Sequence, residues 1–297
     1  MDEFKAFGVH FFVGQVGAND EAGHLKDMLQ SIIDDQLVTV STYGSMTYEI
    51  RDLESHSNGA TYTGVLAKFR TDDFPHVGEP GGEEEELNIG DNQGLIEKNH
   101  FIFHRQNQLL VWQVNGNASS EKRLGEVLSD ISNETVVFNP VFQPDAVRRL
   151  MRGNVTPLSL EFTIARPTNT DLIPRNQWNE GLLSLMGQAG GARFSAKITS
   201  DSRSAEGDKR KLMPRMKSAL KELSGMDGVT KAKFIVEEDG IKHPLDLLED
   251  RVKSSQTVEM IGRYPSVRSM YSALRRAKTE QQAALDEYFG QDGNALI

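Results

Sequence analysis

Residues 231–247 read KAKFIVEEDGIKHPLDL, and this stretch decides the fold class. Its two parts, Lys231–Glu237 and Ile241–Leu247, have the composition and alternation of strands that each bury one face. The dipeptide Asp239-Gly240 between them is typical of a type I′ hairpin turn. Strands joined in this way are antiparallel. The sequence therefore predicts an α+β fold rather than a doubly wound parallel sheet.

The rest of the C-terminal half continues this organisation. Further strands are predicted at Leu158–Arg166, Ala192–Thr199 and Thr257–Ile261. Helices are predicted around Trp178–Met186, over Lys209–Ser224 and from Ser266 to about Phe289. In Ala192–Thr199 the alternation puts Arg193 and Lys197 on the face opposite the apolar residues.

The N-terminal half has strands and helices of its own. The predicted strands are Phe4–Val13, Met46–Ile50, Tyr62–Phe69, His100–Arg105, Leu109–Val114 and Thr135–Phe142. A short Gln/Asn turn joins His100–Arg105 to Leu109–Val114 as a hairpin. One predicted helix has an apolar face made of Leu25, Met28, Leu29, Ile32 and Ile33. Another begins at Ser119 or Ser120. Residues 71–92 form a predicted long acidic loop. We place a domain boundary near Gly153–Pro157, which gives two lobes, 1–153 and 154–297, each a mixed or largely antiparallel sheet with helices packed on it.

Charge is distributed unevenly along the chain. Residues 1–140 hold 9 Lys and Arg against 23 Asp and Glu, a net charge of −14. Residues 141–297 hold 24 Lys and Arg against 20 Asp and Glu, a net charge of +4. The simplest interpretation is solubility and mutual attraction of the halves, and the sharper one is a second half that binds a polyanion.

Composition excludes several classes of function. The chain has no cysteine, so disulfides, cysteine-zinc sites and thiol catalysis are excluded. No apolar run approaches the ~18 residues that a membrane helix needs. The first residues, Met1–Phe4, lack the basic and apolar regions of a secretory signal. We expect a cytoplasmic protein with no cofactor.

Two short motifs resemble ligand-binding sites, but we do not interpret either of them as one. His100 and His104 fall on a predicted strand, where four residues span ~13 Å, too far to share one zinc. Gly14-x-x-Gly17 lies between a strand and a helix, but it matches neither phosphate-loop fingerprint, and acidic residues follow it. We interpret it as a turn.

A metal-dependent nuclease is the enzymatic alternative. It would use Asp246 and Glu259 with Lys253 or Lys233, on the pattern of an acid on one strand and an acid and lysine on the next. The strand Thr257–Ile261 has Met260 where the simplest spacing requires lysine. The sequence therefore leans away from an enzyme without deciding the question.

Basic residues gather on two predicted helices. If both helices pack on one sheet face, their outer surfaces form a stripe that neutralises phosphates, and the alternative is two ordinary solvated helix faces. The candidate nucleic-acid-binding residues are Lys209, Arg210, Lys211, Arg215, Lys217, Arg268, Arg275 and Arg276.

Three stretches together carry a family resemblance. They are Tyr62–Arg70 followed by Phe74-Pro75, Gly94–Phe101 followed by Leu109–Asn115, and Lys231–Val236 with Leu245–Arg251. This layout resembles uncharacterised bacterial and prophage-borne proteins, some of them associated with phage exclusion or antiphage defence. The resemblance covers about residues 60–280, and it implies a setting rather than a reaction.

The leading hypothesis is a non-enzymatic component of bacterial antiphage defence that binds nucleic acid or a protein partner, including a second copy of itself. The first alternative is the nuclease. The second is an inhibitor whose acidic first half mimics DNA.

Overall fold

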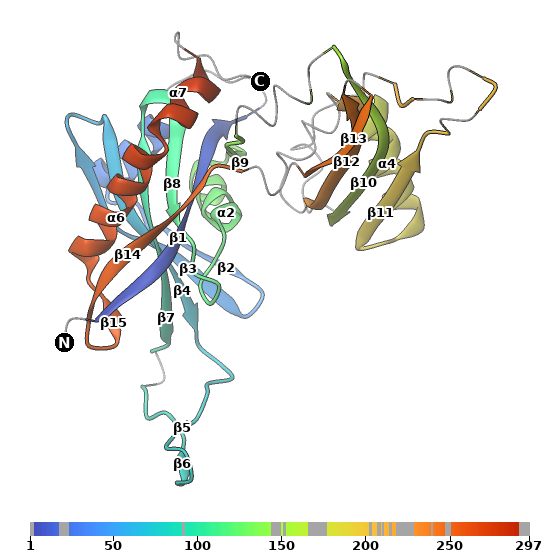
Figure 1. Cartoon of the computed structure of the whole chain (residues 1–297). Helices are drawn as coiled ribbons and strands as arrows, with labels where there is room; N and C mark the ends of the chain where they lie inside the picture. Colours follow the sequence, from blue (N-terminus) through green and yellow to red (C-terminus); the bar gives the residue numbers. More distant parts are fainter. Residues whose placement is uncertain are drawn as a thin grey trace. The chain divides into compact units, whose positions relative to one another are not determined.

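The computed structural model describes residues 3–17, 24–90, 93–143, 150, 153–165, 177–201, 204–206, 209, 211–213, 216–217, 229–238, 240–246 and 251–290. They form an α+β fold built from antiparallel sheets with helices packed on them, as the sequence predicts (Figure 1). The chain divides into two units. The first is Met1–Phe138 with Lys253–Glu280, and the second is Asn139–Val252 with Gln281–Ile297.

The first unit contains a nine-stranded sheet in the order β15-β14-β1-β8-β7-β4-β3-β2, with β9 also paired to β1. Its strands are β1 (Glu3–Val16), β2 (Val40–Tyr43), β3 (Met46–His56), β4 (Thr61–Arg70), β7 (Leu95–His104), β8 (Leu109–Gln113), β9 (Val136–Pro140), β14 (Lys253–Ile261) and β15 (Tyr264–Pro265). The 3₁₀ turn η1 (Gln106–Gln108) joins β7 to β8. The predicted hairpin of these two strands is confirmed by their antiparallel register.

Helices cover both faces of this sheet. On one face, α1 (His24–Asp34) and α2 (Glu121–Ser132) bury Leu25, Leu29 and Leu124 against the aromatic residues of the central strands. On the other face, α6 (Val267–Glu280) packs Met270 and Ala273 against β14. Side chains alternate along each strand, so a strand such as β7 sends residues into both cores.

A hairpin carrying β5 (Val77–Gly78) and β6 (Glu84–Glu85) extends away from the sheet between β4 and β7 (Figure 1). It includes the run Glu83–Glu86, whose side chains are all exposed. The predicted acidic loop therefore contains a short ribbon.

The second unit contains a four-stranded antiparallel sheet in the order β11-β10-β12-β13. The strands are β10 (Val155–Ala165), β11 (Arg193–Thr199), β12 (Val229–Glu238) and β13 (Ile241–Asp246). The helix α4 (Gln177–Ala189) buries Leu182 and Met186 against the apolar side of the sheet. The predicted hairpin over 231–247 is confirmed, because β12 and β13 pair from Glu238↔Ile241 to Lys233↔Asp246.

The expected division at 153/154 needs correction. The strand β14 lies in the C-terminal half of the sequence, but it pairs with β1 over eight consecutive residues, from Glu3↔Met260 to His10↔Lys253. Residues 253–280 therefore belong to the first unit, and the second unit is inserted before them. Local sequence patterns identify a strand, whereas its partner is set by pairing across the whole chain.

Two predicted helices also differ from the structure. Of the expected helix over 209–224, the described residues are Lys209, 211–213 and 216–217, and only Met216 and Lys217 are α-helical. The expected helix from Ser266 to Phe289 is divided into α6 and α7 (Gln282–Phe289), with Gln281 at the N-cap of α7.

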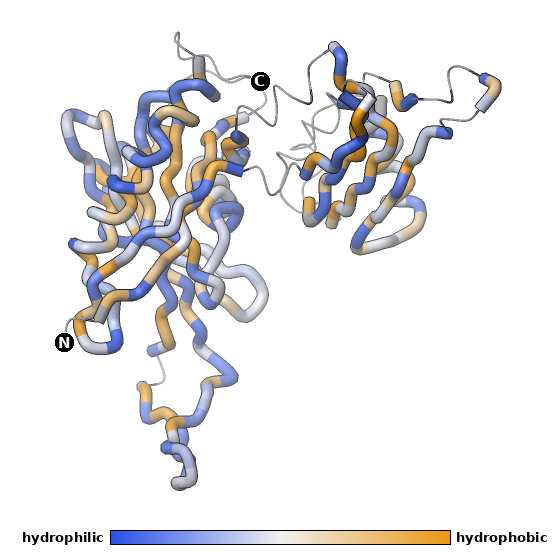
Figure 2. The backbone as a smooth tube through the Cα atoms, viewed as in Figure 1, coloured by the Kyte–Doolittle hydropathy of each residue, from blue (hydrophilic) through white to orange (hydrophobic). Residues whose placement is uncertain are grey.

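Hydrophobic residues are concentrated in the strands of each sheet (Figure 2). Within the described ranges, no helix is both long enough and apolar enough to cross a membrane.

Two glycines inside helices provide a matched test of the packing. A Cβ added to Gly125 in α2 would lie 2.7 Å from the carbonyl oxygen of Val136, whereas one added to Gly181 in α4 would meet nothing within 4 Å. We expect Gly125→Ala to lower the free energy of unfolding by about 1–3 kcal/mol, because the helix must move away from β9. Gly181→Ala should raise it by up to about 1 kcal/mol. Urea unfolding followed by circular dichroism measures both, and equal effects would contradict the packing described for α2.

Candidate polyanion-binding face

The four-stranded sheet has one apolar and one charged face. Leu160, Phe162, Ala232 and Phe234 point into the core beneath α4. The residues between them point to the opposite side, which we call the open face. Its charged residues are Arg193 and Lys197 on β11, Glu161 on β10, Lys231, Lys233 and Glu237 on β12, and Lys242 and Asp246 on β13.

A row of alternating charge crosses all four strands. Lys197 lies opposite Glu161, Glu161 opposite Lys233, and Lys233 opposite Asp246. Lys231, two residues before Lys233, donates a hydrogen bond from Nζ to Glu161 Oε1 at 2.5 Å. Lys233 Nζ is 2.5 Å from Asp246 Oδ2. These are the cross-strand opposite-charge pairs that stabilise sheets.

Cations outnumber carboxylates on the open face by five to three. The hydrogen bond from Lys231, together with the charges of Lys231, Lys197 and Lys233, lowers the pKa of the Glu161 carboxyl group. Three lysines therefore act on a single carboxylate. The side chains of Arg193, Lys197 and Lys233 are exposed, so an anionic ligand can reach them.

The open face does not have the arrangement of a metal centre. Glu161 and Asp246 lie on strands separated by β12, and the ammonium of a lysine is bonded to each of them. In the part of the chain that the structure describes, no three His, Asp or Glu side chains gather where they could hold a metal ion.

The basic residues predicted on the helix over 209–224 take other roles. Lys209 forms an ion pair with Glu206 at 2.8 Å. Lys217 is buried, and its Nζ donates to the carbonyl oxygen of Val155 at 2.5 Å. Burial lowers the pKa of its ammonium group. Lys211 is exposed, and Arg210 and Arg215 lie outside the described residues.

The other predicted basic residues lie on α6, in the first unit. Arg268 and Arg275 are exposed. Arg276 donates to Gln256 Oε1 at 3.3 Å and to the carbonyl oxygen of Thr257 at 2.8 Å, so it is hydrogen-bonded to β14. The two basic clusters therefore pack on different sheets, contrary to the single-sheet arrangement that the stripe requires.

The same topology redistributes the charge. The first unit holds 15 Lys and Arg against 25 Asp and Glu, a net charge of −10, and the second holds 18 of each, a net charge of 0. The basic character of the C-terminal half comes from the β14–α6 segment, which belongs to the acidic unit. In the second unit, polyanion binding depends on how the charges are placed rather than on their sum.

The predicted nuclease residues are divided between the units. Lys233 and Asp246 pair on the open face, whereas Lys253 and Glu259 lie on β14 of the first unit. Sequence reasoning missed Glu161 and Lys231, which occupy the centre of the open face. The signal was present, because the alternation in Leu158–Arg166 and Lys231–Glu237 assigns both residues to the polar side.

His100 and His104 both lie on β7, as predicted. Buried His100 places its Nδ1 2.7 Å from Gln113 Oε1 and its ring edge against Tyr271 of α6. His104 Nε2 is buried without a hydrogen-bond partner in the described structure. Burial, with smaller contributions from Lys278 and Arg275, lowers the pKa of His104 to about 4.

The lowered pKa of His104 predicts loss of stability in acid. Unfolding restores the ordinary pKa near 6.5, so the unfolded chain binds more protons between that value and about pH 4. The free energy of unfolding should therefore fall over this window as pH decreases, by up to about 3 kcal/mol from this group. Urea titrations across the window should show a smaller fall for His104→Leu than for the parent protein. Equal falls would contradict the assignment.

The protein thus has an α+β fold in which a separate sheet unit is inserted before strand β14 of the first sheet. The chain belongs to a family of unknown function (DUF6731), whose model matches residues 25–282. The match includes Asn139–Val252 of the second unit and the returning segment β14–α6, so both are part of the family's common region. A comparison of the sequence with curated proteins finds no match.

Proposed function

We propose that the protein is a non-enzymatic binding component that engages the phosphate backbone of nucleic acid through the open face of the second unit. The observation that supports this most is the group of three lysines, Lys197, Lys231 and Lys233, around Glu161. Arg193 extends the group along the edge strand β11. Lysine and arginine side chains on one surface are the usual partners of phosphates.

The side chains of the open face favour contacts to the backbone rather than to bases. Between the charged residues lie Ser195, Thr163 and Ile235, and none of the described strand residues on this face is aromatic. Unpaired bases are normally held by stacking on aromatic rings, so we expect little base preference. Serine and threonine hydroxyls supply further phosphate contacts.

The ion pairs already present on the face are compatible with binding. The Lys231 and Glu161 side chains are 36% and 40% exposed, and exposed pairs contribute little free energy. A phosphate can therefore replace the carboxylate as the partner of the lysine with little loss of free energy. Glu161 then opposes the ligand, so it limits affinity while holding Lys231 in position.

Charge substitutions at the centre of the face test this proposal in both directions. Lys197→Glu and Lys231→Glu should each weaken binding of labelled DNA or RNA and reduce the salt dependence of the binding constant. Glu161→Gln should strengthen binding, because it removes the carboxylate that competes with phosphate. Binding would be measured by fluorescence anisotropy over a salt series, with and without Mg²⁺.

Arg268→Glu is the matched control, since it reverses an exposed cation on α6 of the other unit. An equal loss in this control would show that net charge, not the open face, governs binding. Absence of binding at low salt would exclude nucleic acid and favour an acidic protein partner or a second copy of the chain. Cleavage that requires Mg²⁺ would favour the nuclease instead.

We also propose a biological role for the protein: it is a cytoplasmic component of bacterial antiphage defence, as the family resemblance implies. Cells that express the protein should plate phage less efficiently than cells that express Lys197→Glu/Lys231→Glu at equal abundance. Plaque counts that are equal for both and equal to those of an empty-vector strain, across a panel of phages, would count against this setting.

A further inference from the structure

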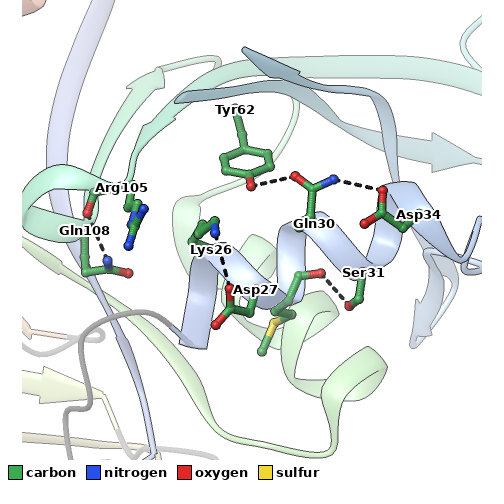
Figure 3. A network of polar contacts seen from close by, with 9 residues as sticks. Lys26, Asp27, Gln30, Ser31, Asp34, Tyr62, Arg105 and Gln108 are labelled. Carbon is green, nitrogen blue, oxygen red and sulfur yellow. Dashed lines mark hydrogen bonds and ion pairs between the residues drawn. The ribbon is translucent and has the colours of Figure 1, made fainter. Parts of the chain in front are cut away.

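The hairpin turn between β3 and β4 lies beside two cationic side chains from other elements. Ser57, Asn58 and Gly59 all have positive φ, at 52°, 54° and 77°. The carbonyl oxygen of Ala60 accepts a hydrogen bond from the backbone of Arg105, at the end of β7. Lys26, in the first turn of α1, reaches the same turn. Figure 3 shows Lys26 and Arg105 near one another beside α1.

Packing holds the Lys26 side chain across the turn. A Cβ on Gly59 would lie 3.0 Å from Lys26 Cε and 3.0 Å from the Tyr62 hydroxyl oxygen, so the lysine stem covers the bare glycine. Gly59 is buried as a result. The lysine Nζ is 3.6 Å from Asp27 Oδ1, which is an ion pair but longer than a hydrogen bond.

Arg105 is fixed through its backbone and exposed at its side chain. Its carbonyl oxygen accepts hydrogen bonds from the backbone and the side chain of Gln108, at 3.2 Å and 3.0 Å. In the described part of the chain, no carboxylate lies within ion-pair distance of its guanidinium group. Five N–H donors are therefore available at a fixed point beside the turn.

Of the nearby acids in the described residues, Asp27 is paired with Lys26, and none is paired with Arg105. Tyr62 is fully buried and donates to Gln30 Oε1 at 2.9 Å, and Gln30 Nε2 donates to Asp34 Oδ1 at 2.9 Å (Figure 3). The Asp34 carboxylate is thus engaged with Gln30. Asp27 is the acid beside Lys26, and its side chain is 71% exposed. Burial raises the pKa of Tyr62, while the charge of Arg105 acts in the opposite direction.

A cation in the first turn of a helix is unfavourable, because the helix dipole is positive there. Lys26 is held in that position, and Arg105 adds a second positive charge at the same turn. This happens in a unit whose net charge is −10, where carboxylates are abundant. An anion between the two side chains would relieve both repulsions.

We propose that this turn binds a phosphate group between Lys26 and Arg105. The guanidinium fork of Arg105 takes two phosphate oxygens, and the Lys26 ammonium takes a third as a point charge. The site lies in the first unit and does not depend on the open face of the second.

The test is isothermal titration calorimetry of the full chain with inorganic phosphate, in a buffer free of other oxyanions. Saturable binding is expected, and Lys26→Gln and Arg105→Gln should each weaken it by about tenfold or more. Asp27→Asn should strengthen it, because it removes the carboxylate next to Lys26. Lys122→Gln, which neutralises a cation on α2 of the same unit, should leave it unchanged.

Gly59→Ala tests the position of Lys26 independently. Its Cβ must displace the lysine stem, at a backbone conformation that alanine rarely adopts, so this variant should also weaken phosphate binding. Circular dichroism identifies any variant that fails to fold, and the Lys26→Gln and Arg105→Gln results then decide. A nucleoside monophosphate in place of inorganic phosphate distinguishes a nucleotide site, which binds it more tightly, from a site for phosphate alone. No saturable heat at millimolar phosphate, or equal weakening by Lys122→Gln, would overturn the proposal.

Discussion

The antiparallel pairing of β1 with β14 is the constraint on which the rest of the structure depends. It joins residues 3–10 to residues 253–260, so the first sheet is complete only when both ends of the chain have been brought together. Everything between β9 and β14 must leave the first unit and return to it. The second sheet is therefore an insertion rather than a C-terminal domain, and α6 returns with β14 to cover the face of the sheet opposite α1 and α2.

This pairing also decides which electrostatic surfaces can exist. Because α6 returns with β14, its arginines lie on the acidic unit, and Arg276 donates a hydrogen bond to β14. The second unit is left neutral overall, and strand alternation places the lysines of β11 and β12 on one face of its sheet. A charge profile along the sequence misplaces both features, since it assigns residues to halves of the chain that the fold does not keep separate.

What the sequence predicts well is local. The hairpin over 231–247, the β7–β8 hairpin and the α+β class follow from alternation and turn residues, and all are confirmed. The buried state of Lys217 could not be predicted, because an amphipathic pattern assigns lysine to solvent and the carbonyl of Val155 that receives it lies 62 residues away. The centre of the open face can be predicted only in part. Alternation assigns each residue to one face of the sheet. The order of strands that brings Lys197, Glu161 and Lys233 into one row depends on pairing between distant segments, which local patterns do not contain.

The row of alternating charge also makes a stable face compatible with the binding that we propose for it. Lys197 and Lys233 lie on either side of β10 and would repel one another, and Glu161 between them offsets that repulsion in the free protein. Because the Lys231–Glu161 pair is partly exposed, it holds its side chains in place without a large free-energy penalty for rearrangement. A ligand must then compete with carboxylates that are already present, so a dense array of phosphates is favoured over a single anion. If the face binds as we propose, the same carboxylates that limit affinity give it a preference for a polyanion.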